Sequence, residues 1–200
     1  RIIYKMRTCI VNPSRCGSTL LLHILDKYFR MSRTPNYEML YEVMDDKIGR
    51  DLLEKHKHNN FLFKYQYLFT HKPLLGADKY IVIDRKDKEA WAFSSFHAWI
   101  NSHAHGKLDA NTQYMTDKKA LQIHTENLLN CLPSWEAEKA RLISHGAVNL
   151  WYEDIKDKDA VEILNMCGYP DARPFDKDNL YFNGIKLEKV WSCKHKYNYL

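Results

Sequence analysis

The sequence has little of what marks disordered, fibrous, secreted or membrane-spanning chains. Its 200 residues include only 7 Gly and 6 Pro, and 45% of them are hydrophobic, which excludes collagen-like and low-complexity chains. Five cysteines, an odd number without paired spacing, are atypical of a disulfide scaffold. The longest apolar run near the N-terminus, residues 20–22, is far shorter than a membrane span or a signal-peptide core. We therefore expect one globular domain over residues 1–200, cytoplasmic and without a membrane span. Because the chain begins at Arg1, an upstream targeting or anchor segment stays open.

The excess of positive charge is confined to one end of the chain. The net charge is +5, but residues 1–35 alone carry +6 and the other 165 residues carry −1. A basic face that wraps nucleic acid would spread its lysines and arginines along the chain. The distribution indicates a localised anion site and no nucleic-acid partner.

Apolar segments with strand and helix patterns alternate along the sequence. Such alternation implies parallel βαβ crossovers, so we predict an α/β fold of three layers, an open and mostly parallel sheet with flanking helices. Ligands in such sheets bind at the carboxyl ends of the strands. The expected strands are 6–11, 61–67, 80–83 and 147–152. The expected helices are 18–29, 51–57, 89–100, 117–144 with a break or kink at Pro133, and 159–166.

The segment Pro13-Ser-Arg-Cys-Gly-Ser-Thr19 connects the first expected strand to the first expected helix. Gly17 allows a ligand to approach the backbone closely, and the helix N-terminus supplies free N–H groups. Ser18 and Thr19 add hydroxyl donors, and Arg15 adds a fixed charge with bidentate geometry. No Lys precedes Ser18, so the Walker A signature of ATPases and kinases is absent. The segment predicts an anion-binding loop of another kind.

A thiol phosphatase is one alternative for this loop. Cys9 and Arg15 have the C-x5-R spacing of low-molecular-weight tyrosine phosphatases and arsenate reductases, which this stretch resembles. Cys16 replaces the usual Ser, no Gly lies between Cys9 and Arg15, and no Asp-Pro dipeptide supplies a general acid. Cys9 is more simply a small, buried strand residue.

The stretch Arg15-Cys-Gly-Ser-Thr-Leu-Leu21 also resembles the 5′-phosphosulfate loop of sulfotransferases that use 3′-phosphoadenosine 5′-phosphosulfate (PAPS). The motif is most similar to that of trehalose-type bacterial and tyrosylprotein sulfotransferases, with Cys16 where Ser is usual. The resemblance implies the P-loop-NTPase-like sulfotransferase fold. It also implies that the 5′-phosphosulfate is held by Arg15, Cys16, Gly17, Ser18, Thr19 and Leu20.

Two later elements resemble the same family in the same order. Arg85, at the end of a strand, is followed nine residues later by Ser94, which is the pattern of the family's 3′-phosphate clamp; Ser95 is an alternative to Ser94. Leu150-Trp-Tyr-Glu-Asp-Ile155 resembles a late strand end where the family places a Tyr near the nucleotide, which implies that Tyr152 contacts the cofactor.

The resemblance implies an enzyme that transfers a sulfuryl group from PAPS to a hydroxyl acceptor by in-line displacement. Positioning and electrostatics supply most of such catalysis, and no metal is required. The acceptor class stays open among sugar, lipid, small alcohol and protein tyrosine. A nucleotide-binding protein without catalysis is a further alternative.

Three catalytic roles follow from the resemblance. Arg15 neutralises the leaving oxygen, Glu38 is the general base, and Lys64 faces the sulfuryl group. We expect Glu42, one helical turn after Glu38, as the alternative base. Further alternatives are His71 and His97 for the base, and Lys186 and Lys189 for a basic tail over the nucleotide.

Overall fold

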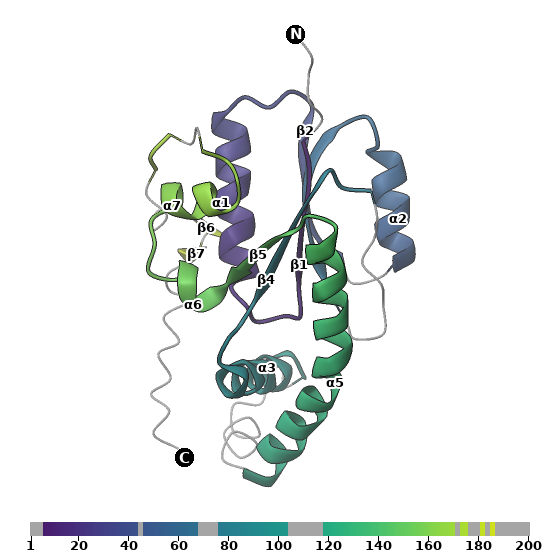
Figure 1. The fold of residues 1–200 in the computed structure, drawn as a ribbon, viewed down its shortest axis with the longest axis vertical. Helices are drawn as coiled ribbons and strands as arrows, with labels where there is room; N and C mark the ends of the chain where they lie inside the picture. Colours follow the sequence, from purple (N-terminus) through teal and green to yellow (C-terminus); the bar gives the residue numbers. More distant parts are fainter. Residues whose placement is uncertain are drawn as a thin grey trace.

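Five parallel strands form one sheet in the computed structural model, which describes residues 6–43, 46–67, 76–103, 118–170, 173–175, 181–182 and 185–186. The strand order is β2-β3-β1-β4-β5, with β1 at the centre (Figure 1). All four pairings are parallel, as the alternating pattern predicts. The strands are β1 (Arg7–Asn12), β2 (Tyr37–Val43), β3 (Asn60–Gln66), β4 (Lys79–Asp84) and β5 (Val148–Trp151).

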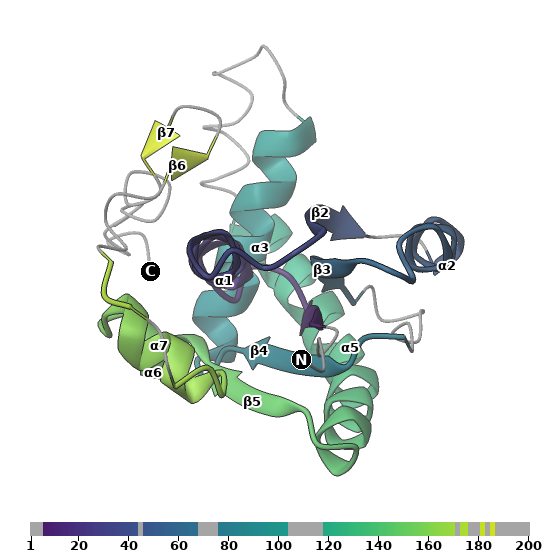
Figure 2. The same ribbon diagram turned by 90° about the horizontal axis from the view of Figure 1, so that it is seen from above.

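Helices cover both faces of this sheet and make three layers (Figure 2). Helices α1 (Ser18–Met31) and α7 (Ala160–Met166) pack on one face, in the core cluster that contains Ile10 and Ile81. Helices α2 (Asp46–Lys55) and α5 (Lys118–Ser144) pack on the other, in the cluster that contains Val11 and Val82. Helix α3 (Lys88–His103) lies beyond the carboxyl end of β4 (Figure 1). The predicted α/β class and layer arrangement are confirmed.

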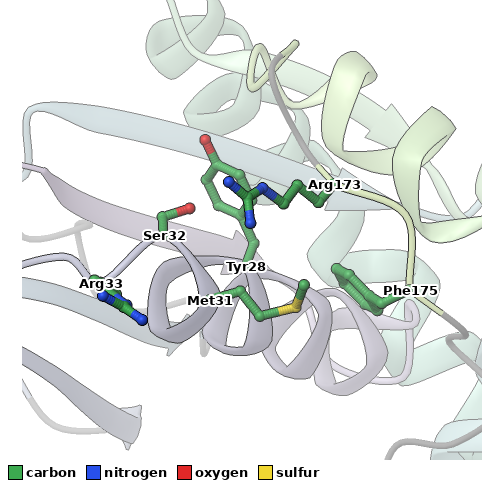
Figure 3. A pocket seen from close by; sticks show the side chains of 6 residues that line it. All are labelled: Tyr28, Met31, Ser32, Arg33, Arg173 and Phe175. Atoms are coloured by element: carbon green, nitrogen blue, oxygen red, sulfur yellow. The ribbon is translucent and has the colours of Figure 1, made fainter.

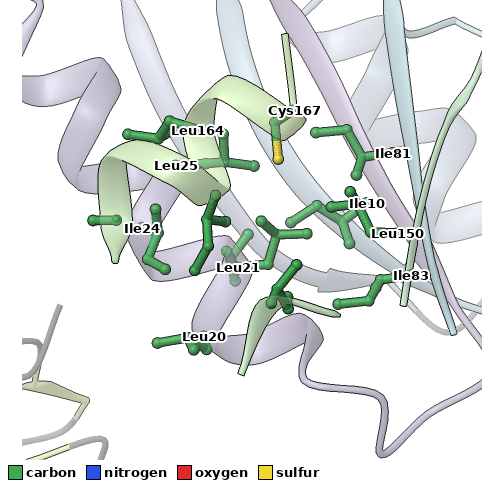
Figure 4. Packing of buried hydrophobic residues seen from close by; sticks show 14 of the residues in the cluster. Ile10, Leu20, Leu21, Ile24, Leu25, Ile81, Ile83, Leu150, Leu164 and Cys167 are labelled. Atoms are coloured by element: carbon green, nitrogen blue, oxygen red, sulfur yellow. The ribbon is translucent and has the colours of Figure 1, made fainter. Parts of the chain in front are cut away.

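The core between α1 and the sheet fixes the helix whose first turn follows the predicted anion loop. Leu21, Ile24 and Leu25 are fully buried against Ile10 and Ile81 (Figure 4). Each such side chain contributes about 1.5–3 kcal/mol when its apolar surface leaves water. The apolar spacing in α1 thus holds the helix N-terminus rigidly against the end of β1.

Strand β2 corrects one prediction. The segment with Glu38 and Glu42, expected to be helical, is a strand whose pairing with β3 shifts register between Leu40 and Glu42. Tyr37 and Met39 pack toward α1, whereas Leu40 packs toward the opposite face. This alternation is the two-residue period of a strand, and the register shift obscures it in the sequence.

The remaining elements are short. Helix α6 (Tyr152–Ile155) follows β5 directly, and β6 (Tyr181–Phe182) pairs antiparallel with β7 (Ile185–Lys186). Lys186 lies in β7, whereas His71 and Lys189 lie outside the described residues. Helix α5 is one helix from Lys118 to Ser144, with Pro133 inside it. Across the described ranges, no helix combines the length and apolar composition needed to cross a bilayer.

Candidate anion-binding site

The predicted loop lies at the point where the chain connections that leave the sheet run to opposite sides of β1. The chain leaves β1 for the β2 edge and later returns to β4, on the other side of β1. Parallel sheets bind ligands at such switch points, in the crevice beyond the carboxyl ends of the strands. The loop 13–17 after β1 and the residues after β4 therefore lie at the same edge of two neighbouring strands, where such a crevice is expected.

The backbone of the loop adopts a conformation that side chains disfavour. Ser14 (φ 80°), Arg15 (φ 51°) and Gly17 (φ 80°) all have left-handed backbone angles. A non-Gly residue in this region costs on the order of 1 kcal/mol or more, and such strain concentrates at functional sites. Successive turns of this kind aim backbone N–H groups at a common point and make an anion-binding nest.

The first turn of α1 adds further donors. The first helical hydrogen bond runs from the N–H of Leu21 to the carbonyl of Gly17, so the N–H groups of Ser18, Thr19 and Leu20 precede the helical ladder. This turn contains no acidic residue. The positive end of the helix dipole and these N–H groups favour an anion here.

Buried contacts hold the loop in this shape. The carbonyl oxygen of Ser14 accepts hydrogen bonds from Cys16 Sγ at 2.9 Å and from Trp91 Nε1 at 3.0 Å. Cys16 is fully buried, and burial raises the pKa of its thiol well above the ordinary value. The side chains of Cys16 and Leu20 both face the core. Of the predicted nucleotide contacts, these two residues can offer their backbone groups only.

Two hydrogen bonds connect predicted site residues from distant parts of the chain. Arg15 Nε donates to Ser94 Oγ in α3 at 3.2 Å. Lys64 Nζ, in β3, donates to Thr19 Oγ1 at 3.2 Å, and the Lys64 side chain is only 4% exposed. A buried ammonium needs a hydrogen-bond partner, and Thr19 Oγ1 is one. The charge of Lys64 therefore lies beside the first turn of α1, where it strengthens the positive potential at the loop.

Arg85 and Tyr152 also meet at this edge of the sheet. The Arg85 guanidinium carbon lies 4.8 Å from the centroid of the Tyr152 ring, and Nη1 donates to the carbonyl of Ala90 at 3.3 Å. Arg85 Nε is buried without a hydrogen bond, with the nearest Glu153 oxygen 4.0 Å away. Ser95 Oγ, in α3, is likewise buried without a partner among the described residues. An unsatisfied guanidinium N–H such as that of Arg85 fits an oxyanion such as a phosphate.

Asp84, at the end of β4, organises this edge and escaped the sequence analysis. The fully buried carboxylate accepts hydrogen bonds from Lys88 and Lys139 at 2.8 Å and from Trp135 Nε1 at 3.0 Å. Burial opposes ionisation of Asp84, but these hydrogen bonds outweigh it and lower the pKa of the carboxyl. Asp84 Oδ1 also accepts the backbone N–H of Arg85. The one signal in the sequence is its place two residues after Val82, on the same buried face.

Glu38 lies at the wrong end and on the wrong face of the sheet to act at the loop. Its register partner is Phe61, which in turn pairs with Arg7 at the start of β1. The loop follows Asn12, roughly 16 Å further along the strands at about 3.3 Å per residue. Glu38 Oε2 contacts His56 Nδ1 at 2.5 Å on the α2 side. The structure therefore corrects the prediction that Glu38 is the base.

Register places the alternative residue, Glu42, beside Lys64 near the carboxyl edge. A residue that the sequence analysis missed, His23, lies in α1 one turn after Thr19 and is 9% exposed. Burial and the charge of Lys64 outweigh the effect of Asp26 and lower the pKa of His23. The helical spacing of His23 and Thr19 is the signal that could have found it. His97 lies in α3.

The geometry contradicts the thiol-phosphatase alternative. Cys9 lies within β1, paired with Phe63 and Tyr80, and is 1% exposed in the core on the α5 face. Burial raises the pKa of its thiol well above the ordinary value, whereas a nucleophilic cysteine needs a lowered pKa and access to its substrate. Within the described part of the chain, no cluster of three metal-ligating side chains occurs either.

Comparison with known proteins adds little to this geometry. Neither a protein-family model nor a curated protein matches the sequence. Among solved structures, the chain is similar to retinol dehydratase in a complex with retinol and PAP, with 16% identity and a TM-score of 0.43. The match covers 92% of this chain, and 62% of the length of that one. This likeness is too distant to assign a family or an activity.

Proposed function

We propose that the chain is a PAPS-dependent sulfotransferase whose donor binds in the crevice between β1 and β4. The observation that carries the proposal is the pairing of Arg15 with Ser94 above a strained loop at a helix N-terminus. Arg15 and Ser94 belong to two separate motifs that resemble the 5′-phosphosulfate loop and the 3′-phosphate clamp of that family. Their contact supports one binding site for both phosphate groups.

In this proposal the two ends of the nucleotide have different partners. The N–H groups of residues 16–20, with the Ser18 and Thr19 hydroxyls, hold the 5′-phosphosulfate. The unsatisfied Arg85 Nε and the hydroxyls of Ser94 and Ser95 take the 3′-phosphate. Tyr152, stacked on Arg85, lies beside the nucleotide.

The chemistry is an in-line displacement at sulfur. The acceptor hydroxyl oxygen forms a bond to sulfur while the bond from sulfur to the 5′-phosphate oxygen breaks, and 3′-phosphoadenosine 5′-phosphate (PAP) leaves. Arg15, Lys64 and the loop N–H groups stabilise the charge that develops on the leaving oxygen. Glu42 takes the hydroxyl proton in this proposal, and its backbone pairing with Lys64 in the sheet register supports that role.

The test is transfer of radiolabelled sulfate from PAPS to a panel of sugars, lipids, small alcohols and tyrosine peptides. Glu42→Gln should lower transfer by about 10²–10⁴-fold, the range for loss of a general base. Glu38→Gln, in the same strand, is the matched control and should leave transfer unchanged. Equal losses in both variants would contradict the assignment of the base. PAP binding without transfer to any acceptor would instead support a non-catalytic nucleotide-binding protein.

A further inference from the structure

The basic residues of the N-terminal segment divide between the two ends of α1. Among the described basic residues of this segment, Arg15 lies in the loop before the helix. Arg30 lies in the last turn, Lys27 just before that turn, and Arg33 just beyond the helix. The helix spans 14 residues, so these two groups of charges are separated by roughly 20 Å at 1.5 Å per residue. The nucleotide site therefore leaves most of the N-terminal basic excess without a role.

A pocket of about 570 Å³ lies at this far end of α1 (Figure 3). Its volume is in the range of small-molecule sites. Four of the lining residues come from the end of α1 and the turn after it, and two come from the segment 173–175. The lining residues are Tyr28, Met31, Ser32, Arg33, Arg173 and Phe175.

Packing against the core fixes the walls of this pocket. The Tyr28 ring lies 5.2 Å from the Tyr169 ring, and both Tyr28 and Phe175 pack against the main hydrophobic cluster. Lys27 Nζ lies 4.9 Å from the centroid of the Phe175 ring, which ties the segment 173–175 to α1. Packing thus holds two of the lining side chains, Tyr28 and Phe175, in place.

The two arginines of the pocket differ from other arginines of the protein. Arg7, Arg30 and Arg141 each hold a carboxylate, Asp78, Asp26 and Glu138 respectively. Within the described ranges, neither Arg33 nor Arg173 has a carboxylate partner, and no acidic residue lines the pocket. Arg33 and Arg173 line the pocket together with the hydroxyl-bearing Ser32 and Tyr28, and guanidinium and hydroxyl groups are the donors that a tetrahedral oxyanion needs.

The carbonyl end of a helix repels an anion, but here the last carbonyls are occupied. Those of Tyr28, Phe29 and Arg30 accept backbone N–H groups of Ser32, Thr34 and Arg33. Opposite the hydroxyls, Met31 is 42% exposed and Phe175 presents an aromatic surface. The lining therefore combines an oxyanion subsite with an apolar wall.

We propose that this pocket is a second anion site, which binds a phosphate or sulfate monoester carried on a small apolar or aromatic body. Arg33 and Arg173 hold the oxyanion, and Met31 and Phe175 contact the apolar body. The site is independent of the nucleotide crevice and does not rest on the proposed sulfotransferase activity.

The test is a backbone NMR titration of the whole chain with phenyl phosphate and phenyl sulfate. Both should shift the Ser32 and Arg33 amide signals in a saturable way, and phenol should not. The double variant Arg33→Gln/Arg173→Gln should weaken binding at least about tenfold, the loss expected for charge-assisted hydrogen bonds. Arg30→Gln removes the same charge nearby but outside the pocket, and should change the affinity less than about twofold.

Four outcomes would overturn the assignment. The first is the absence of shifts at Ser32 and Arg33, and the second is undiminished binding in a double variant whose unfolding midpoint matches the parent. The third concerns the apolar wall. If inorganic phosphate binds as tightly as phenyl phosphate, Met31 and Phe175 do not contribute to binding. Arg15→Gln should leave these shifts intact, and their loss in that variant would show that the ligand binds at the loop instead.

Discussion

Helix α1 follows a strained, partly exposed loop, the predicted anion site, and ends at an exposed pocket that is lined by two arginines. At the first end, backbone N–H groups, Arg15 and Lys64 converge, and their side chains are linked to Ser94 and Thr19. The second end is the negative end of the helix dipole, so arginine side chains must supply the positive charge. Backbone N–H groups can therefore contribute to anion binding at the first end, whereas binding at the second depends on side chains. The direction of the helix dipole causes this difference.

The largest expected difference is in the free energy of unfolding that is lost when a carboxylate is removed near the loop or in the far half of α1. Asp84→Asn leaves the Lys88 and Lys139 charges without their buried partner, so it should lower the free energy of unfolding by about 3–5 kcal/mol. Asp26→Asn, in the C-terminal half of α1, removes a surface pair with Arg30 and a hydrogen bond from Tyr37. It should cost only about 1 kcal/mol. Urea unfolding of both variants measures the difference, and equal losses would contradict it.

The same carboxylate should make stability depend on acid pH. Because the pKa of Asp84 is lowered in the folded state, its contribution is complete above the unfolded value of about 3.9 and is lost as pH falls through the folded value. Stability of the parent chain should therefore fall more steeply below about pH 4 than that of Asp84→Asn. Parallel acid curves for the two proteins would show that Asp84 does not titrate in this way.

The second largest effect concerns binding of PAP at the loop. Arg15→Ala should raise the dissociation constant of PAP by roughly 10–100-fold, since a charge-assisted hydrogen bond is worth about 1.5–3 kcal/mol. Arg33→Ala removes the same side chain at the opposite end of α1 and should change it less than about twofold. Calorimetric titration of each variant checks the contrast, and an equal loss would place the nucleotide elsewhere.

A smaller effect separates backbone strain from binding. Gly17 and Gly146 both have left-handed backbone angles, and a Cβ at Gly146 meets nothing within 4 Å. Alanine at either position should lower the free energy of unfolding by about 1–2 kcal/mol. Only Gly17→Ala should also weaken PAP binding, because Gly17 belongs to the loop. Weakened binding in Gly146→Ala would show that general destabilisation, and not the loop, controls affinity.

The smallest effect comes from the middle of α1. Burial lowers the pKa of His23 in the folded state, so the unfolded chain binds more protons near pH 6.5 and stability should rise with pH through that value. His23→Gln should reduce this rise without removing it, because the pKa of His124 is also lowered by burial. Unfolding curves between about pH 5 and 8 test this. An unchanged pH dependence in the variant would contradict it.

Sequence patterns predicted the layers and the place of the loop at a strand-to-helix turn because both are local. The apolar spacing of α1, the Gly17 turn and the motif spacing of Arg85 and Ser94 can be recognised without a structure. The role of Asp84 could not be predicted, because its partners Trp135 and Lys139 lie more than 50 residues away. Glu38 was misplaced because the register shift in β2 hid a strand, and with it the end and face on which Glu38 lies.

The central claim is that the crevice between β1 and β4 binds the 3′,5′-bisphosphate of a PAPS-type nucleotide. A thermal-shift titration with PAP, beside ATP and inorganic phosphate, tests it most directly. At about 100 times Kd, a ligand of the folded state adds roughly 2.7 kcal/mol, which should raise Tm by about 5–10 °C in a domain of this size. We predict that shift for PAP in the parent chain and its loss in Arg85→Ala. No shift with PAP, or an equal shift with inorganic phosphate, would contradict the account.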